Sequence, residues 1–115
     1  MPVITVKPCT LVLFGALGDL ALRKLFPALY QLDRAGLLHA ETRIVALARE
    51  TGDSETHLAA IDDWLHRYVP VMDLDGEVLE RFRARLSYLR MDFTEVADYA
   101  ALVDEVAGSD TLIAY

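Results

Sequence analysis

The sequence predicts an α/β fold, in which a parallel β-sheet is flanked by helices. Short apolar runs typical of strands alternate with longer amphipathic segments typical of helices. The first run, TLVLF at residues 10–14, is almost continuously apolar, as expected for a strand buried on both faces of a parallel sheet. A turn with two glycines follows this run directly and opens the first helix.

The first helical segment covers residues 18–38, where leucines recur near helical spacing. Pro27 interrupts it, because proline has no N–H group to donate and its ring clashes with the carbonyl four residues earlier. We therefore expect one kinked helix or two short helices in series. Gly36 is expected to form the C-terminal cap, since glycine readily adopts the left-handed conformation found there.

The rest of the chain continues the alternation, which favours right-handed crossovers between parallel strands. A helix is expected to begin among residues 53–56, where Asp and Ser/Thr can cap it, and to end before Pro70. The further expected helices cover residues 75–86 and 94–106, and the further expected strands cover residues 42–48, 87–93 and 111–115. The last strand, TLIAY, has no closing turn, so the sheet is expected to be incomplete at its C-terminal end.

Length and charge restrict the possible functions. The 115 residues suit one domain, and 54% of them are hydrophobic, which argues against disorder. The 18 acidic and 11 basic side chains give a net charge of −7. Such a surface repels a phosphate backbone, so we expect no nucleic-acid partner.

Several other classes of site and location are not expected. Cys9 is the single cysteine, which excludes an intrachain disulfide and fits a reducing compartment. The sequence shows neither a secretory signal nor an apolar stretch of the ~20 residues that span a bilayer. The three histidines are far apart, without the spacing of metal ligands. We expect a cytoplasmic protein with no membrane partner and no metal.

The turn after the first strand, GALGDLA at residues 15–21, has the features of a dinucleotide-binding loop. Gly15 permits a tight turn, Gly18 lets the backbone approach a pyrophosphate, and Ala21 lets the helix pack closely on the sheet. The N-terminus of the helix presents N–H groups and a partial positive charge. This strand–turn–helix context favours a Rossmann-like fold over a simple glycine turn. A P-loop is excluded, because no Gly-Lys-Ser/Thr follows at the required spacing.

Residues 14–32, FGALGDLALRKLFPALYQL, resemble the glucose-6-phosphate dehydrogenase family. That family carries Gly-Ala-Ser/Thr-Gly-Asp-Leu-Ala, then a basic pair and a proline. The similarity extends to residues 36–38 and 44–49, is diffuse over 50–92, and returns at 111–115. The resemblance implies oxidation of glucose 6-phosphate to 6-phosphogluconolactone, the first step of the pentose phosphate and Entner–Doudoroff routes, with hydride transfer to NADP. The matching residues are Gly15, Ala16, Gly18, Asp19, Leu20, Ala21, Arg23, Lys24 and Pro27.

The resemblance also implies roles for particular residues. Lys24 corresponds to a family lysine that helps to bind the sugar, although a solvated helix lysine is the alternative. Asp19 is expected to act at the start of the helix and not in proton transfer. The residues expected to bind the cofactor are Gly15, Ala16, Leu17, Gly18, Asp19, Leu20 and Arg49.

The cofactor prediction depends on three positions. An arginine after the second strand accommodates the 2′-phosphate of NADP, and Arg49 matches it, with a solvated arginine as the alternative. Leu17 stands where the family usually has Ser or Thr, and it cannot donate to a phosphate. The carboxylate of Glu50 would repel a 2′-phosphate but can accept a hydrogen bond from the 2′-hydroxyl of NAD. We therefore expect NADP to be preferred only modestly, with NAD binding also possible.

The family's catalytic segment is not in this sequence. By resemblance, the general base is a histidine within Arg-Ile-Asp-His-Tyr-Leu-Gly-Lys, a string that residues 1–115 do not contain. We interpret residues 1–115 as the N-terminal part of a dinucleotide-binding domain, without catalytic residues and without the substrate and dimerisation domain. We expect this stretch alone to be inactive, and the full-length protein to be a homo-oligomeric NADP-dependent dehydrogenase acting on glucose 6-phosphate.

Two other functions stay open at this point. Extended short-chain reductases and sugar epimerases use a similar glycine loop but need Tyr-x-x-x-Lys. None of Tyr30, Tyr68, Tyr88 and Tyr99 has a lysine four residues later. A non-enzymatic nucleotide-binding module is the second alternative, and it should show no preference for nicotinamide cofactors.

Overall fold

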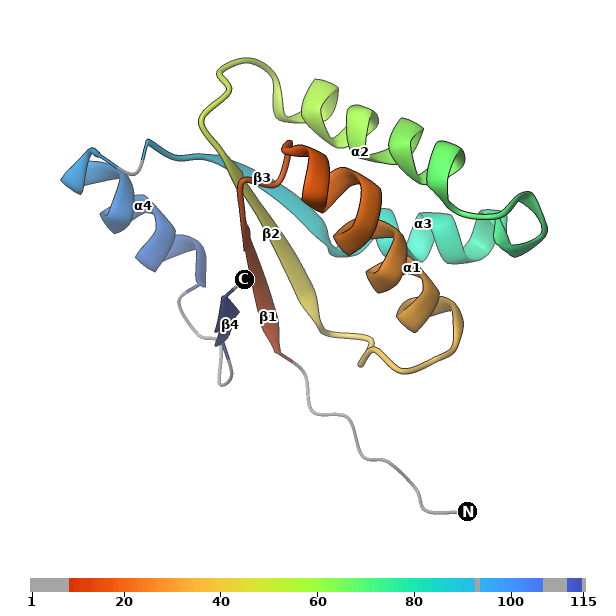
Figure 1. The fold of residues 1–115 in the computed structure, drawn as a ribbon. Helices are drawn as coiled ribbons and strands as arrows, with labels where there is room; N and C mark the ends of the chain where they lie inside the picture. Colours follow the sequence, from red (N-terminus) through yellow and green to blue (C-terminus); the bar gives the residue numbers. More distant parts are fainter. Residues whose placement is uncertain (1–8, 93, 107–111, 115) are drawn as a thin grey trace.

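The fold is built around a four-stranded parallel sheet, seen in a computed structural model that describes residues 9–92, 94–106 and 112–114 (Figure 1). The strand order is β3-β2-β1-β4, and every pairing is parallel. This is the order of a doubly wound nucleotide-binding sheet, so the predicted α/β, Rossmann-like fold is confirmed. The strands are β1 (Thr10–Phe14), β2 (Arg43–Ala48), β3 (Leu86–Arg90) and β4 (Leu112–Ala114).

Helices lie on both faces of the sheet. Three of them, α1 (Phe26–Arg34), α2 (Ser54–Tyr68) and α3 (Gly76–Arg85), lie together on one side, whereas α4 (Val96–Val106) lies on the other (Figure 1). The crossovers from β1 through β3 therefore cover one face, and the crossover from β3 to β4 covers the opposite face.

The strand side chains alternate between two apolar cores. Leu13 and Ile44 are buried against α1, α2 and α3, whereas Val12 and Val45 are buried on the opposite face, where Leu102 of α4 packs. Successive side chains of a strand point to opposite faces, so a strand buried on both must be apolar at nearly every position. This explains why the runs TLVLF and IVALA lack the alternation of a half-exposed strand.

The predicted interruption at Pro27 takes the form of a π-helical turn. The turn covers Ala21–Leu25 directly before α1, and the N–H of Phe26 donates to the carbonyl of Ala21, five residues back. Pro27 then lies in the first turn of α1. A wider turn at this point breaks the regular i to i−4 pattern, in which proline would lack a donor and meet a carbonyl.

The ends of the helices follow the predicted capping signals. Gly36 has φ +75°, and the N–H groups of Gly36 and Leu37 donate to the carbonyls of Asp33 and Leu32, which is a Schellman cap. Asp53 and Asp75 each accept a backbone N–H at the start of α2 and α3. The strands begin and end within a few residues of the predicted positions. Of the residues expected in strands, 93, 111 and 115 lie outside the described part.

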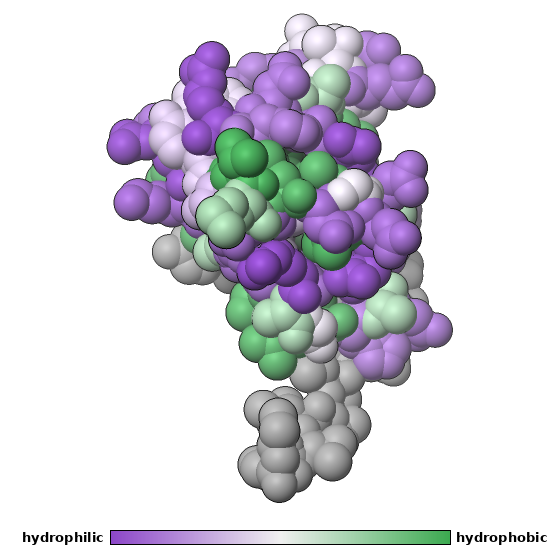
Figure 2. Space-filling view, turned by 90° about the vertical axis from the view of Figure 1, so that its right-hand side faces the viewer, coloured by the Kyte–Doolittle hydropathy of each residue, from purple (hydrophilic) through white to green (hydrophobic). Residues whose placement is uncertain are grey.

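The surface at the right-hand side of Figure 1 is mainly hydrophilic, with a hydrophobic group near its middle (Figure 2). Two apolar residues, Val71 and Met72, are 80% and 94% exposed in the 3-10 turn that follows α2.

The Tyr30 hydroxyl of α1 donates to the carbonyl of Asp73 at 2.7 Å and accepts the N–H of Asp75 at 3.0 Å. The turn is therefore tied to α1 by a tyrosine that is itself fully buried.

A buried ion pair joins the C-terminal ends of α1 and α3. Asp33 is 1% exposed and accepts hydrogen bonds from Arg85 at 3.0 and 3.1 Å and from Arg81 at 2.9 Å. Arg85 also donates to the backbone carbonyls of His39 and Thr42, in the segment that leads into β2. All of these polar groups lie at the amino-terminal edge of the sheet, so the pair ties both helices to the start of β2.

We expect Asp33→Ala to lower the free energy of unfolding by about 3–5 kcal/mol, because it leaves the buried guanidinium of Arg85 without its counter-charge. Asp62→Ala is the matched control. Asp62 pairs with Arg83 at 2.8 Å on a partly exposed surface, where such a pair is worth about 0–1 kcal/mol. Urea denaturation of the three proteins measures the difference, and equal losses for the two variants would contradict a buried role for Asp33.

Candidate functional site

The glycine loop turns sharply at the carboxyl end of β1. Gly15 has φ +66°, a left-handed conformation that favours glycine. The N–H of Ala16 donates to the carbonyl of Leu47 at 2.8 Å, and the N–H of Gly18 donates to the carbonyl of Gly15 at 2.9 Å. A Cβ on Gly18 would lie 3.0 Å from the same Gly15 oxygen. The backbone conformation therefore favours glycine at position 15, and a side chain at position 18 would crowd the turn.

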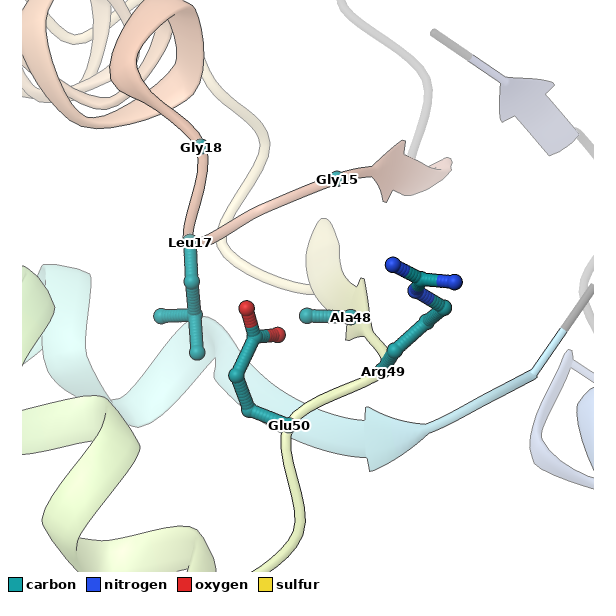
Figure 3. A pocket seen from close by; sticks show the side chains of 6 residues that line it. All are labelled: Gly15, Leu17, Gly18, Ala48, Arg49 and Glu50. Atoms are coloured by element: carbon teal, nitrogen blue, oxygen red, sulfur yellow. The ribbon is translucent and has the colours of Figure 1, made fainter.

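The loop and the end of β2 enclose a pocket of about 180 Å³ (Figure 3). The pocket lies at the carboxyl edge of the sheet, which is where parallel α/β sheets bind ligands. Three of its six lining residues are glycine or alanine, so a ligand could approach the main chain closely there. The lining residues are Gly15, Leu17, Gly18, Ala48, Arg49 and Glu50.

The start of the first helix faces the same edge. The N–H of Leu22 donates to the carbonyl of Gly18 at 3.1 Å, which marks the first helical hydrogen bond. The N–H groups just before it belong to the unsatisfied first turn, which carries a partial positive charge. Asp19 is exposed and pairs with Arg23 at 3.1 Å, and this pairing raises the pKa of Arg23. Asp19 therefore stands at the helix start as an ion-pair partner.

Arg49 and Glu50 present opposite charges at the mouth of the pocket. Both side chains are exposed and follow β2 directly. Figure 3 shows the guanidinium of Arg49 on one side of Ala48 and the carboxylate of Glu50 on the other, next to Leu17. The pocket can thus offer a cation to a phosphate or a carboxylate to a hydroxyl.

The structure brings together four of the residues predicted to bind a cofactor: Gly15, Leu17, Gly18 and Arg49. The others lie nearby without lining the pocket. Ala16 is completely buried beneath the loop, whereas Leu20 is 59% exposed on the helix. Lys24, the predicted sugar contact, is exposed on the π-helical turn.

Sequence reasoning missed the residues that support the β2 end of the pocket. The hydroxyl of Tyr88 in β3 donates to the carbonyl of Glu50 at 2.5 Å. Burial, and to a lesser degree the charge of Glu50, raises the pKa of Tyr88, so its hydroxyl keeps the proton that it donates. No local motif marks Tyr88, because its position depends on the register between Ala46 of β2 and Tyr88 of β3.

Two further findings apply to the described part of the chain. Within residues 9–92, 94–106 and 112–114, no cluster of three or more His, Cys, Asp or Glu side chains is arranged to hold a metal ion. Among the helices in those ranges, none is long and apolar enough to cross a membrane.

Comparison with known proteins agrees with the geometry of this edge. Residues 12–113 match the family model described as glucose-6-phosphate dehydrogenase, NAD binding domain. The chain belongs to the glucose-6-phosphate dehydrogenase family. The matched region is the nicotinamide-dinucleotide-binding part of that family, which agrees with a glycine loop and a pocket at the carboxyl edge of a parallel sheet.

Curated relatives and solved structures support the same assignment. Glucose-6-phosphate 1-dehydrogenase of Mycolicibacterium smegmatis is 43% identical over 91% of this chain, and that of Gluconobacter oxydans is 42% identical over 76%. These matches span 21% and 18% of the relatives, so the chain covers about one fifth of their length.

Among solved structures, the Mycobacterium avium enzyme superposes with a TM-score of 0.83 at 29% identity, covering 96% of this chain and 24% of that one. A glucose-6-phosphate dehydrogenase in complex with its substrate gives a TM-score of 0.76 at 24% identity, covering 99% of this chain and 24% of that one. The second likeness concerns the fold alone.

We expect Gly15→Ala to lower the free energy of unfolding by about 1–2 kcal/mol, because a side chain is strained at φ +66°. Gly76→Ala is the matched control. Gly76 opens α3, and a Cβ there would meet nothing within 4 Å, so this change should be neutral or stabilising by up to about 1 kcal/mol. Thermal unfolding of both variants measures the effect, and an unchanged Gly15→Ala protein would contradict the strained turn.

Proposed function

We propose that this chain forms the cofactor-binding part of a glucose-6-phosphate dehydrogenase. The full-length protein would oxidise glucose 6-phosphate to 6-phosphogluconolactone and pass the hydride to NADP, with NAD as a second acceptor. The observation that carries this proposal is the pocket at the carboxyl edge of the sheet. Gly15 and Gly18 of the glycine loop line this pocket together with Arg49. The loop has the sequence pattern of the family to which the chain belongs.

The glycine loop supports a role in binding the pyrophosphate. Gly15 and Gly18 have no side chains to cover the backbone at the pocket. The first turn of the helix supplies N–H donors and a partial positive charge. The net charge of −7 repels anions at long range, so a phosphate needs local positive groups of this kind. Ala16, Asp19 and Leu20 complete the proposed loop around the same turn.

The pair Arg49 and Glu50 supports binding of both cofactors. The guanidinium of Arg49 can pair with the 2′-phosphate of NADP, while the carboxylate of Glu50 can accept a hydrogen bond from the 2′-hydroxyl of NAD. Leu17 lines the same pocket and offers no donor to a phosphate. NADP is therefore proposed as the preferred cofactor, by a modest margin.

The remaining assignments are extrapolated from the family. Lys24, exposed one helical turn beyond the loop, is proposed to contact the sugar phosphate. Residues 1–115 are proposed as the N-terminal part of the dinucleotide-binding domain. The general base and the substrate and dimerisation domain would lie in the part that the longer relatives have beyond the matched region. A homo-oligomeric, cytoplasmic enzyme is proposed on the same basis.

In the full-length enzyme, we expect Arg49→Ala to raise the Kd of NADP by about ten- to a hundredfold and to change that of NAD little, because only NADP has the 2′-phosphate. Arg67→Ala is the matched control, since Arg67 stacks on Trp64 in α2 and does not line the pocket. Titration with both cofactors measures the effect. An equal loss for NADP and NAD would refute the role of Arg49.

Glu50→Gln tests the other side of the pair. Removing the negative charge should tighten NADP and weaken NAD, so the preference for NADP should rise by about two- to tenfold. The ratio of kcat/KM for the two cofactors measures it. An unchanged ratio would mean that Glu50 does not face the ribose.

The 115-residue chain expressed alone should not produce NADPH from glucose 6-phosphate. The histidine segment that serves the family as general base is absent from these residues, and such a base contributes about 10²–10⁴-fold to the rate. Absorbance at the NADPH band, with the full-length enzyme as the positive control, measures it. Turnover by the short chain would show that these residues contain a catalytic base.

A further inference from the structure

The loop between β2 and α2, which carries Arg49 and Glu50, is held through four successive backbone carbonyls. The N–H of Met91 donates to Ala48 at 2.8 Å, and the Nε of Arg90 donates to Arg49 at 3.3 Å. The carbonyls of the next two residues, Glu50 and Thr51, are likewise bonded to side chains. These bonds tie the backbone of the loop to β3 and α2.

Tyr88 and His57 supply the bonds to those last two carbonyls. The Tyr88 hydroxyl donates to Glu50 at 2.5 Å, and Nε2 of His57 lies 3.0 Å from the carbonyl of Thr51, which can only accept. The two rings also pack together, with centroids 4.5 Å apart and an angle of 33°. Each ring therefore limits the movement of the other.

The backbone of the loop is shaped to reach these two side chains. Gly52 has φ +119°, which turns the chain after Thr51, and Asp53 then caps α2 by accepting the N–H of Glu55 at 3.1 Å. The segment from the end of β2 to the start of α2 is thus defined at both ends. Within this segment, the carbonyl of Glu50 is bonded to one hydroxyl, that of Tyr88.

We propose that Tyr88 is a positioning residue that sets cofactor preference through Glu50. This inference rests on the proposed function and adds a specificity determinant to it. The bond from Tyr88 fixes the Glu50 backbone and so keeps the carboxylate next to Leu17 at the pocket (Figure 3). There the carboxylate can accept a hydrogen bond from the 2′-hydroxyl of NAD. The backbone carbonyl of Arg49 accepts a separate bond, from Nε of Arg90. The Tyr88 hydroxyl also lies 3.4 Å from the carbonyl of Ala48, but that carbonyl keeps the shorter bond from the N–H of Met91 at 2.8 Å. Losing the Tyr88 hydroxyl therefore loosens the group that serves NAD and spares the group that serves NADP.

The test compares Tyr88→Phe with the wild type in the full-length gene product, by titration with NADP and with NAD and by steady-state kinetics. The change keeps the ring and its packing on His57 and removes only the donor. We expect the Kd and KM of NAD to rise about two- to tenfold, the range for one hydrogen bond, with those of NADP and both kcat values nearly unchanged. The preference for NADP therefore rises.

Tyr30→Phe is the matched structural control. It removes a hydroxyl that also bonds to backbone, at Asp73 and Asp75, but far from the pocket. We expect it to lower stability and to leave the ratio of the two cofactor affinities unchanged. If Tyr88→Phe weakens the binding of NADP and NAD equally, it too leaves the ratio of the two affinities unchanged. Tyr88 would then have only a structural role, and the inference would be overturned.

A double-mutant cycle then identifies the route of the effect. Because Tyr88 acts through Glu50, Tyr88→Phe should shift the cofactor ratio in the wild type and leave it unchanged in a Glu50→Gln background. Additive shifts would overturn the inference. So would a wild-type enzyme that binds NADP but not NAD, since Glu50 would then have no ligand to serve. A wild-type protein that binds neither dinucleotide would instead refute the proposed function itself.

Discussion

The parallel pairing of β1 with β2 is the interaction on which the rest of the structure depends. Its register places Phe14 beside Leu47, and the bond from the N–H of Ala16 to the carbonyl of Leu47 extends the pairing past the end of β1. The glycine turn is thereby brought next to Arg49, which follows β2. A shift of the strands relative to each other would separate the two halves of the pocket, because each half is attached to the end of one strand.

The two edges of the sheet are organised differently. At the amino-terminal edge, the buried pair of Asp33 and Arg85 joins α1, α3 and the segment before β2. At the carboxyl edge, the side chains of Arg49 and Glu50 are exposed and the backbone beneath them carries the hydrogen bonds. The closed edge contributes to stability, and the open edge leaves charged groups free for a ligand. This division agrees with the general placement of ligands in parallel α/β sheets.

Charge at the pocket is local and works against the charge of the whole chain. The protein carries −7 overall, yet the pocket combines a helix N-terminus with Arg49. Asp19 is close to that terminus, but its carboxylate is paired with the guanidinium of Arg23. An anion bound here would be recognised at short range, where backbone donors and one guanidinium outweigh a field that solvent and salt screen. The same reasoning gives Glu50 its importance, because a single carboxylate at short range can offset a single arginine.

The sequence by itself determined the fold class, the glycine turn and the position of Arg49, because these depend on local rules. Apolar runs indicate strands buried on both faces, and a left-handed turn such as that at Gly15 strongly favours glycine. Pro27 was recognised as an interruption, although the π-helical turn that accommodates it depends on how the helix packs on the sheet. Only the tertiary structure decided which side chains support the site. Tyr88 reaches Glu50, and Arg85 reaches Asp33, through strand register and helix packing, which join residues far apart in the chain and leave no mark in local spacing.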